Sequence, residues 1–152
     1  MTQVTVRPYR DADFDGVDAL WREAFPNYEP RNFAENAVPK KLEVQPELLL
    51  VAVNGDEVIG TTMAGYDGHR GWLYSVAVLE AYRGTGVGAL LLQSAEERLR
   101  ALGCAKINIQ VNEPNKAVVG FYEKLGYASN RALAWASCSS LPLLSQLRRS
   151  VR

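Results

Sequence analysis

The stretch from Leu73 to Leu102 constrains the fold more than any other part of the chain. It begins with a short apolar run typical of a strand, passes through a turn with three glycines, and continues with the apolar spacing of a long amphipathic helix. A helix that starts directly after such a turn leaves several backbone N–H groups without partners, beside the positive end of the helix dipole. These groups together form a site for an anion, and phosphate suits it best.

The glycines of this turn are Gly84, Gly86 and Gly88, which lack the Cβ atoms that would keep a pyrophosphate away from the backbone. Arg83 adds a permanent positive charge beside them. The spacing and the lysine of a P-loop are absent, and no acidic residue ends a strand about 20 residues later, as a dinucleotide-binding fold would require. An ordinary tight connection between a strand and a helix remains the alternative interpretation of the turn alone.

Two segments together resemble the GNAT acetyltransferase superfamily. The segment 83–88 is similar to its motif A, R/Q-x-x-G-x-G/A, with all three defined positions filled. The segment 115–127 is similar to its motif B, N-x-x-A-x-x-F/L-Y-E-K-x-G-F/Y, with Val118 where alanine is usual. The resemblance covers residues 4–127 and is sharpest from Leu73 onward.

The resemblance implies a single α/β (α+β) GNAT domain over residues 1–137, with helices on both faces of a mixed central sheet. The N-terminal strands are expected to be antiparallel and a later parallel pair to splay apart. The tail, 138–152, is left open between a short basic helix and disorder. The hydrophobic pattern predicts strands at 4–8, 48–53, 58–66, 72–79, 106–111 and 131–136, and helices at 14–25, 31–42, 89–102 and after Asn115.

Local signals refine these elements. Asp11 or Asp13 is expected to cap the first helix, and Gly103 to end the long one. The unit from residue 72 to 111 predicts a parallel strand pair with a right-handed crossover. The residues of the long helix expected to face the sheet are Ala89, Leu90, Leu92, Ala95, Leu99 and Leu102.

The resemblance also implies acetyl-CoA as the cosubstrate. Arg83 and the backbone amides of the turn would bind its pyrophosphate, and Asn115 would bind the pantetheine arm or order the start of its own helix. One N–H group of the preceding strand should polarise the acetyl carbonyl. The turn residues are Gly84, Thr85, Gly86, Val87, Gly88 and Ala89, and the strand residues that would pair with the pantetheine are Val76, Ala77 and Val78.

Tyr122 matches the family's tyrosine near the coenzyme sulfur. Because a phenol has a pKa of about 10 and a thiol one of about 8.5, a hydrogen bond to the developing thiolate is more favourable than proton donation in advance. The alternative is a helix tyrosine that packs on the sheet. Acetyl transfer also needs a neutral amine, and Gln110 occupies the place where many relatives carry a glutamate base.

Tyr74 is the second catalytic candidate, because strand alternation predicts it on the same face as Val76 and Val78. A water relay without any single base is also open. The other candidates for the base are Trp72, Asp67, His69 and Glu113. By resemblance, a helix–loop–helix before the sheet would line the acceptor pocket with Trp21, Phe25, Tyr28 and Phe33, although Trp21 and Phe25 fit the core better.

The amino-acid composition limits the classes of partner and the location that we expect for the protein. Lysine plus arginine and aspartate plus glutamate number 17 each, so no nucleic-acid or membrane partner is expected. Two cysteines and one histidine, without a CxxC pair, predict no metal site and no disulfide framework. The N-terminus has no apolar signal region, and the longest apolar run, 48–53, is too short to cross a bilayer. We therefore expect a cytoplasmic protein; a homodimer is left open.

These observations predict an N-acetyltransferase that moves an acetyl group from acetyl-CoA to a primary amine by direct attack in a ternary complex. No cysteine lies in the motifs, which argues against an acyl-cysteine step. The acceptor is a small molecule or a peptide amine. Gln110 keeps the alternative of a non-catalytic acyl-CoA-binding or regulatory module open, and a different nucleotide-binding protein is a third hypothesis.

Overall fold

The computed structural model describes residues 3–111 and 116–129. The chain divides into two compact units, Met1–Lys116 and Ala117–Arg152. The first unit holds the sheet and the helices α1 to α3, and α4 (Lys116–Lys124) stands at the start of the second. The predicted domain boundary at residue 137, the strand at 131–136 and the tail helix lie outside the described residues.

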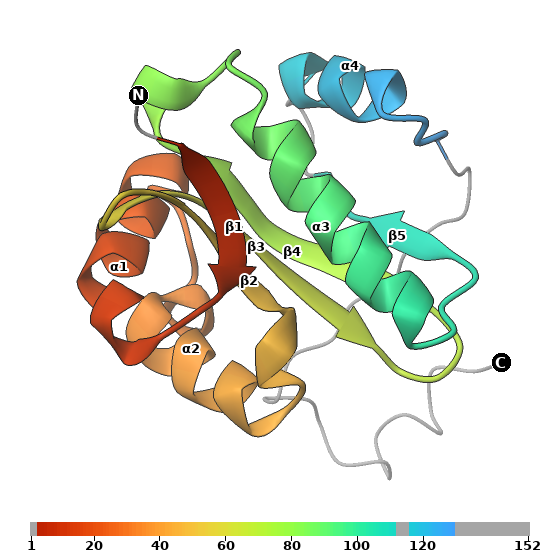
Figure 1. Cartoon of the computed structure of the whole chain (residues 1–152), viewed down its shortest axis with the longest axis horizontal. Coiled ribbons are helices and arrows are strands. Elements are labelled where there is room, and N and C mark those ends of the chain that lie inside the picture. Colours follow the sequence, from red (N-terminus) through yellow and green to blue (C-terminus); the bar gives the residue numbers. More distant parts are fainter. Residues whose placement is uncertain (1–2, 112–115, 130–152) are drawn as a thin grey trace, which may run out of the picture. The chain divides into compact units, whose positions relative to one another are not determined.

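Five strands in the described residues form one mixed sheet, in which each strand lies beside the next one along the chain (Figure 1). Successive strands from the first to the fourth pair antiparallel, and the fifth runs parallel to the fourth, as predicted. The strands are β1 (Val4–Pro8), β2 (Leu49–Asn54), β3 (Glu57–Tyr66), β4 (Gly71–Val78) and β5 (Ile107–Ile109).

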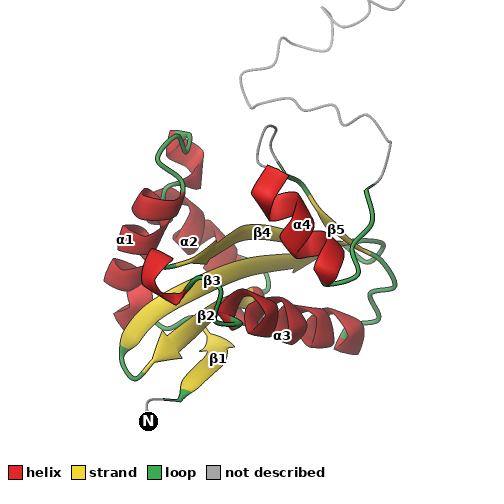
Figure 2. Cartoon of the chain, turned by 90° about the horizontal axis from the view of Figure 1, so that it is seen from above, coloured by secondary structure: helices red, strands yellow, loops and turns green. Residues whose placement is uncertain are grey.

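Helices cover both faces of the sheet (Figure 2). The helices α1 (Phe14–Ala24) and α2 (Ala34–Glu43) lie on one face, and α3 (Val87–Ala101) lies on the other. The strand β3 contacts both layers, since Val58 lies against α1 at Gly16 and Gly60 lies against α3 at Leu91. The sheet is thus a buried middle layer, which explains why β2 is apolar along almost its whole length.

The core beneath α1 is built around Trp21, which is only 2% exposed. Its indole N–H donates a hydrogen bond of 2.8 Å to the hydroxyl of Thr61 on β3, so the polar atom of this large side chain is satisfied inside the core. This burial confirms the core interpretation of Trp21. The buried residues around it are Val17, Leu20, Ala34, Val38, Leu49, Val51, Val53, Val58 and Ala77.

The sheet-facing side of α3 differs from the predicted one. Leu91 is buried, whereas Leu90 and Leu102 are 39% and 46% exposed. Each step along a helix rotates a side chain by about 100°, so the buried residues Val87, Leu91 and Ala95 define a stripe from whose centre position 90 points away. Leu102 lies beyond the last residue of α3. Leu92, Ala95 and Leu99 are buried, as predicted. Gly103, with a φ of 92°, follows the end of α3 as expected.

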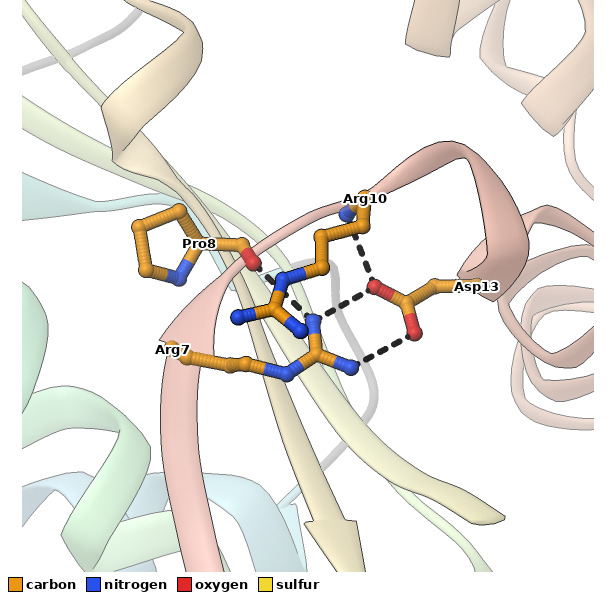
Figure 3. A network of polar contacts seen from close by, with 4 residues as sticks. All are labelled: Arg7, Pro8, Arg10 and Asp13. Carbon is orange, nitrogen blue, oxygen red and sulfur yellow. Dashed lines mark hydrogen bonds and ion pairs between the residues drawn. The ribbon is translucent and has the colours of Figure 1, made fainter. Parts of the chain in front are cut away.

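An ion pair ties β1 to the start of α1 (Figure 3). Arg7 donates two hydrogen bonds to the Asp13 carboxylate, of 2.7 and 2.9 Å, and the backbone N–H of Arg10 donates a third of 2.8 Å. Asp13 therefore stands at the N-terminus of the helix, as predicted, but its side chain makes no cap hydrogen bond to α1. The carboxylate binds the preceding segment instead, because a charged guanidinium is the stronger donor.

Candidate functional site

The glycine turn between β4 and α3 has the conformation that an anion site needs. Gly84 and Gly86 have φ values of 74° and 93°, which residues with a Cβ rarely adopt. Gly86 immediately precedes α3, and no side chain caps this end of the helix. The first N–H groups of α3 therefore lack intrahelical acceptors, while the space where a Cβ of Gly84 or Gly86 would stand is open. A phosphate can approach the backbone here.

Four hydrogen bonds hold the turn in place. The Arg83 Nε donates to the backbone carbonyl of Val78 at the end of β4, over 3.1 Å. The Thr85 hydroxyl donates to the Tyr82 carbonyl. The Tyr82 hydroxyl accepts from Asn54 and donates to Glu57, at 3.0 and 2.9 Å, and so anchors the segment to the β2–β3 hairpin. A pocket of about 310 Å³ lies beside the turn, lined in part by Tyr82, Thr85 and Gly86.

The strand that leads into the turn is open along one side. The ladder between β4 and β5 covers only Gly71–Leu73 and Ile107–Ile109. Beyond Leu73, the side of β4 that faces away from β3 has no strand partner in the described part of the chain. This is the splayed parallel pair that the resemblance implied. Val76, Ala77 and Val78 lie in this open part and lead toward the glycine turn.

The middle of β4 contains a β-bulge centred on Ser75. Ser75 has a φ of 49°, a left-handed conformation that is uncommon for a residue with a side chain. The pairing with β3 shifts at this point, because Thr61 pairs with Ala77 but Met63 pairs with Tyr74. The residue pattern did not predict a role for Ser75. The one signal for it was a polar residue within an otherwise apolar and aromatic strand.

The bulge reverses the predicted orientation of Tyr74. Directly opposed residues of an antiparallel pair share a face, so Tyr74 and Ala77 both lie on the face of Met63 and Thr61. Val76 and Val78 flank Ala77 and point to the other face. The prediction that Tyr74 shares a face with Val76 and Val78 is therefore wrong, because one extra residue in the bulge resets the alternation. Tyr74 lies on the α1 side of the sheet and is 46% exposed.

The segment between α1 and α2 contacts the bulge through Tyr28. Its hydroxyl lies 3.1 Å from that of Ser75, and its ring stacks on Phe25 with the ring centres 4.3 Å apart. Burial raises the pKa of Tyr28, and the hydrogen bond with Ser75 opposes that shift only in part. The hydroxyl is consequently neutral at physiological pH and can donate or accept a hydrogen bond.

The candidates for a general base differ in their surroundings. Asp67 accepts hydrogen bonds from the backbone N–H groups of Arg70 and His69, at 2.7 and 2.8 Å, and these bonds lower its pKa. Its carboxylate therefore closes the turn and is a weaker base than an ordinary aspartate. Burial raises the pKa of Tyr74, which disfavours its ionised form. Gln110 and His69 are exposed.

Tyr122 lies on α4, in the second unit of the chain. Its ring contacts those of Phe121 and Tyr127, with centres 5.2 and 6.0 Å apart. Burial raises its pKa, so the phenol stays protonated at neutral pH. The helix ends before Gly126, whose φ of 91° fits the predicted stop. Asn115 and Glu113 lie outside the described residues.

The described residues lack two further kinds of feature. No group of three or more histidine, cysteine, aspartate or glutamate side chains there is arranged to hold a metal ion. No helix in that part of the chain is both long enough and apolar enough to cross a bilayer.

Comparison with known proteins identifies the family. A model of the Acetyltransferase (GNAT) family matches residues 14–127. An acetyltransferase of Pectobacterium atrosepticum is 43% identical over 122 residues, which cover 80% of this chain and 86% of that protein. An acetyltransferase of Sodalis glossinidius is 43% identical over 122 residues, covering 80% of this chain and 85% of the relative.

Solved structures share the fold at lower identity. The aminoglycoside N-acetyltransferase AAC(6')-Iy in complex with CoA has a TM-score of 0.74 and 15% identity, covering 91% of this chain and 97% of that one. The PaiA N-acetyltransferase from Thermoplasma acidophilum in complex with coenzyme A has a TM-score of 0.74 and 17% identity, over 86% of this chain and 92% of that one. The sheet, the glycine turn and these matches agree, and the chain belongs to the GNAT acetyltransferase family.

Proposed function

We propose that the protein is an N-acetyltransferase that binds acetyl-CoA at the glycine turn and along β4, and transfers the acetyl group to a primary amine in a ternary complex. The observation that carries the proposal is the position of an uncapped helix N-terminus at the end of a half-open strand. The pyrophosphate would bind the amides of residues 84–89 and Arg83. The pantetheine amides would pair with the open side of Val76–Val78, as an additional strand would.

The reaction requires that the amine nitrogen attacks the thioester carbonyl, that the C–N bond forms and that the C–S bond breaks. The amine gives up a proton and the leaving thiolate gains one. Raised pKa values make Tyr28, Tyr74 and Tyr122 hydrogen-bond donors rather than bases at neutral pH. We therefore propose that Tyr122 stabilises the developing thiolate, that Tyr74 contributes to the acceptor side, and that the amine proton leaves to water.

A calorimetric titration of acetyl-CoA tests the site. The wild type should bind with a dissociation constant on the order of micromolar. Gly86→Glu should lose binding, because it places a carboxylate at the anion site. Gly68→Glu is the matched control: Gly68 has a φ of 89° and open space around its Cβ position, but it lies in the β3–β4 turn, so binding should persist.

Two outcomes would overturn the proposal. The first is no binding by wild-type protein that mass spectrometry shows to be without carried-over coenzyme. The second is equal binding by Gly86→Glu and the wild type, which would move the site elsewhere. If acetyl-CoA binds, a screen of small amines, amino acids, aminoglycosides and peptides with detection of the released thiol separates a transferase from a non-catalytic acyl-CoA-binding module.

A further inference from the structure

We infer that a buried hydrogen-bonded relay, from Trp21 through Thr61 to the Ser75 carbonyl, aims the backbone N–H of Val76 at the acetyl carbonyl of the bound thioester. The inference rests on the proposed function and adds to it. That an amide of β4 polarises the acetyl carbonyl is what the family resemblance implies. The inference adds that Trp21 and Thr61 are the positioning residues for that amide.

The direction of each hydrogen bond in the relay follows from the chemistry of its groups. The indole N–H of Trp21 can only donate, so the Thr61 hydroxyl accepts from it over 2.8 Å. The single proton of that hydroxyl is then available to the Ser75 carbonyl, which lies 2.9 Å away. Both Trp21 and Thr61 are almost completely buried, with exposures of 2% and 0%. Water therefore does not compete with the relay.

The relay determines where the next amide points. The C=O and N–H groups of one trans peptide point in opposite directions, and Ser75 C=O and Val76 N–H belong to the same peptide. Since this carbonyl is held toward Thr61 on β3, the Val76 N–H points away from β3. In a regular strand, the backbone N–H and C=O groups of successive residues point alternately toward the two neighbouring strands. The left-handed conformation of Ser75 interrupts this alternation.

The side away from β3 is where β4 lacks a partner strand in the described residues, since its ladder with β5 ends at Leu73. A thioester whose pantetheine pairs with Val76–Val78 has its carbonyl near the end of that run. The Val76 N–H then stabilises the negative charge on the carbonyl oxygen as the amine adds to the carbonyl carbon. When the C–S bond breaks, the electron pair on this oxygen re-forms the C=O bond, and the negative charge leaves with the coenzyme thiolate.

The decisive variant is Thr61→Val, which keeps the shape of the side chain and removes the hydroxyl. Thr62→Val is its matched control. Thr62 is the next residue of β3, is equally buried, and its hydroxyl has no hydrogen-bond partner among the described residues. Thr61→Ser retains a hydroxyl and serves as the rescue.

The first readout does not need the acceptor to be known. The Val76 amide proton is followed by NMR in the presence of CoA and then of acetyl-CoA. A hydrogen bond to the acetyl carbonyl should move this signal downfield with acetyl-CoA and not with CoA. The difference should be present in the wild type, Thr62→Val and Thr61→Ser, and lost in Thr61→Val.

The second readout is kinetic. In Thr61→Val, kcat should fall on the order of tenfold to a hundredfold, while the KM for acetyl-CoA stays within about twofold, because the donor matters in the transition state more than in binding. If Thr61→Val does not fold, Trp21→Phe takes its place. It removes the first donor of the relay and should give a smaller fall in kcat with the same unchanged KM.

The outcomes separate the two proposals. A wild type that binds acetyl-CoA without any acetyl-dependent shift at Val76 overturns this inference and leaves the coenzyme site intact. The same holds if Thr61→Val keeps both the shift and the kcat of the wild type. Failure of the wild type to bind acetyl-CoA overturns the proposed function itself.

Discussion

Ser75 occupies a backbone conformation that costs a residue with a Cβ about 1–2 kcal/mol. The surrounding contacts hold it there: its carbonyl accepts from Thr61 and its hydroxyl contacts Tyr28. A strained backbone conformation is maintained only when several surrounding contacts hold it, and strained residues of this kind concentrate at functional sites. A single residue thus connects the strand of the proposed coenzyme site with the segment that leads from α1 to α2.

Tyr122 gives a second prediction at the scale of one residue. Tyr122→Phe should lower kcat on the order of tenfold to a hundredfold with little change in the KM for acetyl-CoA, because its hydroxyl is expected to act on the developing thiolate. Since burial raises the pKa of Tyr122, the loss should be the same between pH 6 and 9. Steady-state kinetics across that range measures both effects.

Tyr127→Phe is the control for that change. Tyr127 belongs to the same unit and its ring lies 6.0 Å from that of Tyr122, yet motif B accepts phenylalanine at this position. Activity should persist in this variant. A Tyr122→Phe enzyme as active as the wild type would show that the hydroxyl has no catalytic part and that the residue only packs.

The packing between α3 and β3 depends on a glycine. A Cβ at Gly60 would lie 2.8 Å from the Leu91 Cδ1, 3.1 Å from the Ala77 carbonyl oxygen and 3.3 Å from the Val87 Cγ1. Gly60→Ala should therefore lower the free energy of unfolding by about 1–3 kcal/mol through overpacking. Urea denaturation measures the change.

The same strand supplies the comparison, because a Cβ at Gly65 would meet nothing within 4 Å. Gly65→Ala should leave the stability unchanged or raise it by up to about 1 kcal/mol, through a less flexible unfolded chain. Equal stability of the two variants would mean that α3 shifts to accommodate the methyl group. The contact would then be less tight than its distances indicate.

The elements show what the sequence could and could not predict. The positions of the strands along the chain and the start of α3 after the glycine turn followed from the hydrophobic pattern, and the mixed sheet followed from the motif resemblance, because both depend on local residue types. The orientation of Tyr74 did not, since the bulge at Ser75 depends on Thr61 and Trp21, which are distant in sequence. Leu90 was also misplaced: in the run Leu90–Leu92 the neighbouring leucines fit the helical period almost equally well.

At the scale of the whole molecule, the Arg7–Asp13 pair should make stability depend on pH. Burial alone would raise the pKa of Asp13, but hydrogen bonds from Arg7 and the Arg10 N–H outweigh it and hold the pKa below its usual value. A carboxyl whose pKa is lower in the folded state stabilises the fold above its unfolded pKa of about 3.9, and this stabilisation is lost as the pH falls through the folded pKa.

Asp13→Asn should therefore cost about 1–3 kcal/mol of unfolding free energy at pH 7. The cost should be smaller at pH 3, because this pH is below the unfolded pKa and Asp13 of the unfolded wild-type chain binds a proton there. Urea denaturation at both pH values measures the difference. Asp18→Asn is the control, because the Asp18–Arg22 pair is more exposed and its loss should change the free energy of unfolding far less at either pH. A cost for Asp13→Asn that is equal at both pH values would contradict the prediction.

The uncapped start of α3 after Gly84 and Gly86 has one more consequence, for the evolution of the chain. When main-chain amides bind a ligand, selection acts on the conformation of the backbone. Many different side chains allow the same backbone conformation. Surface positions near such a site can drift without loss of the ligand, apart from the glycines that the shape demands. Relatives of this protein can therefore diverge toward new acceptors while the machinery for a common donor is inherited unchanged.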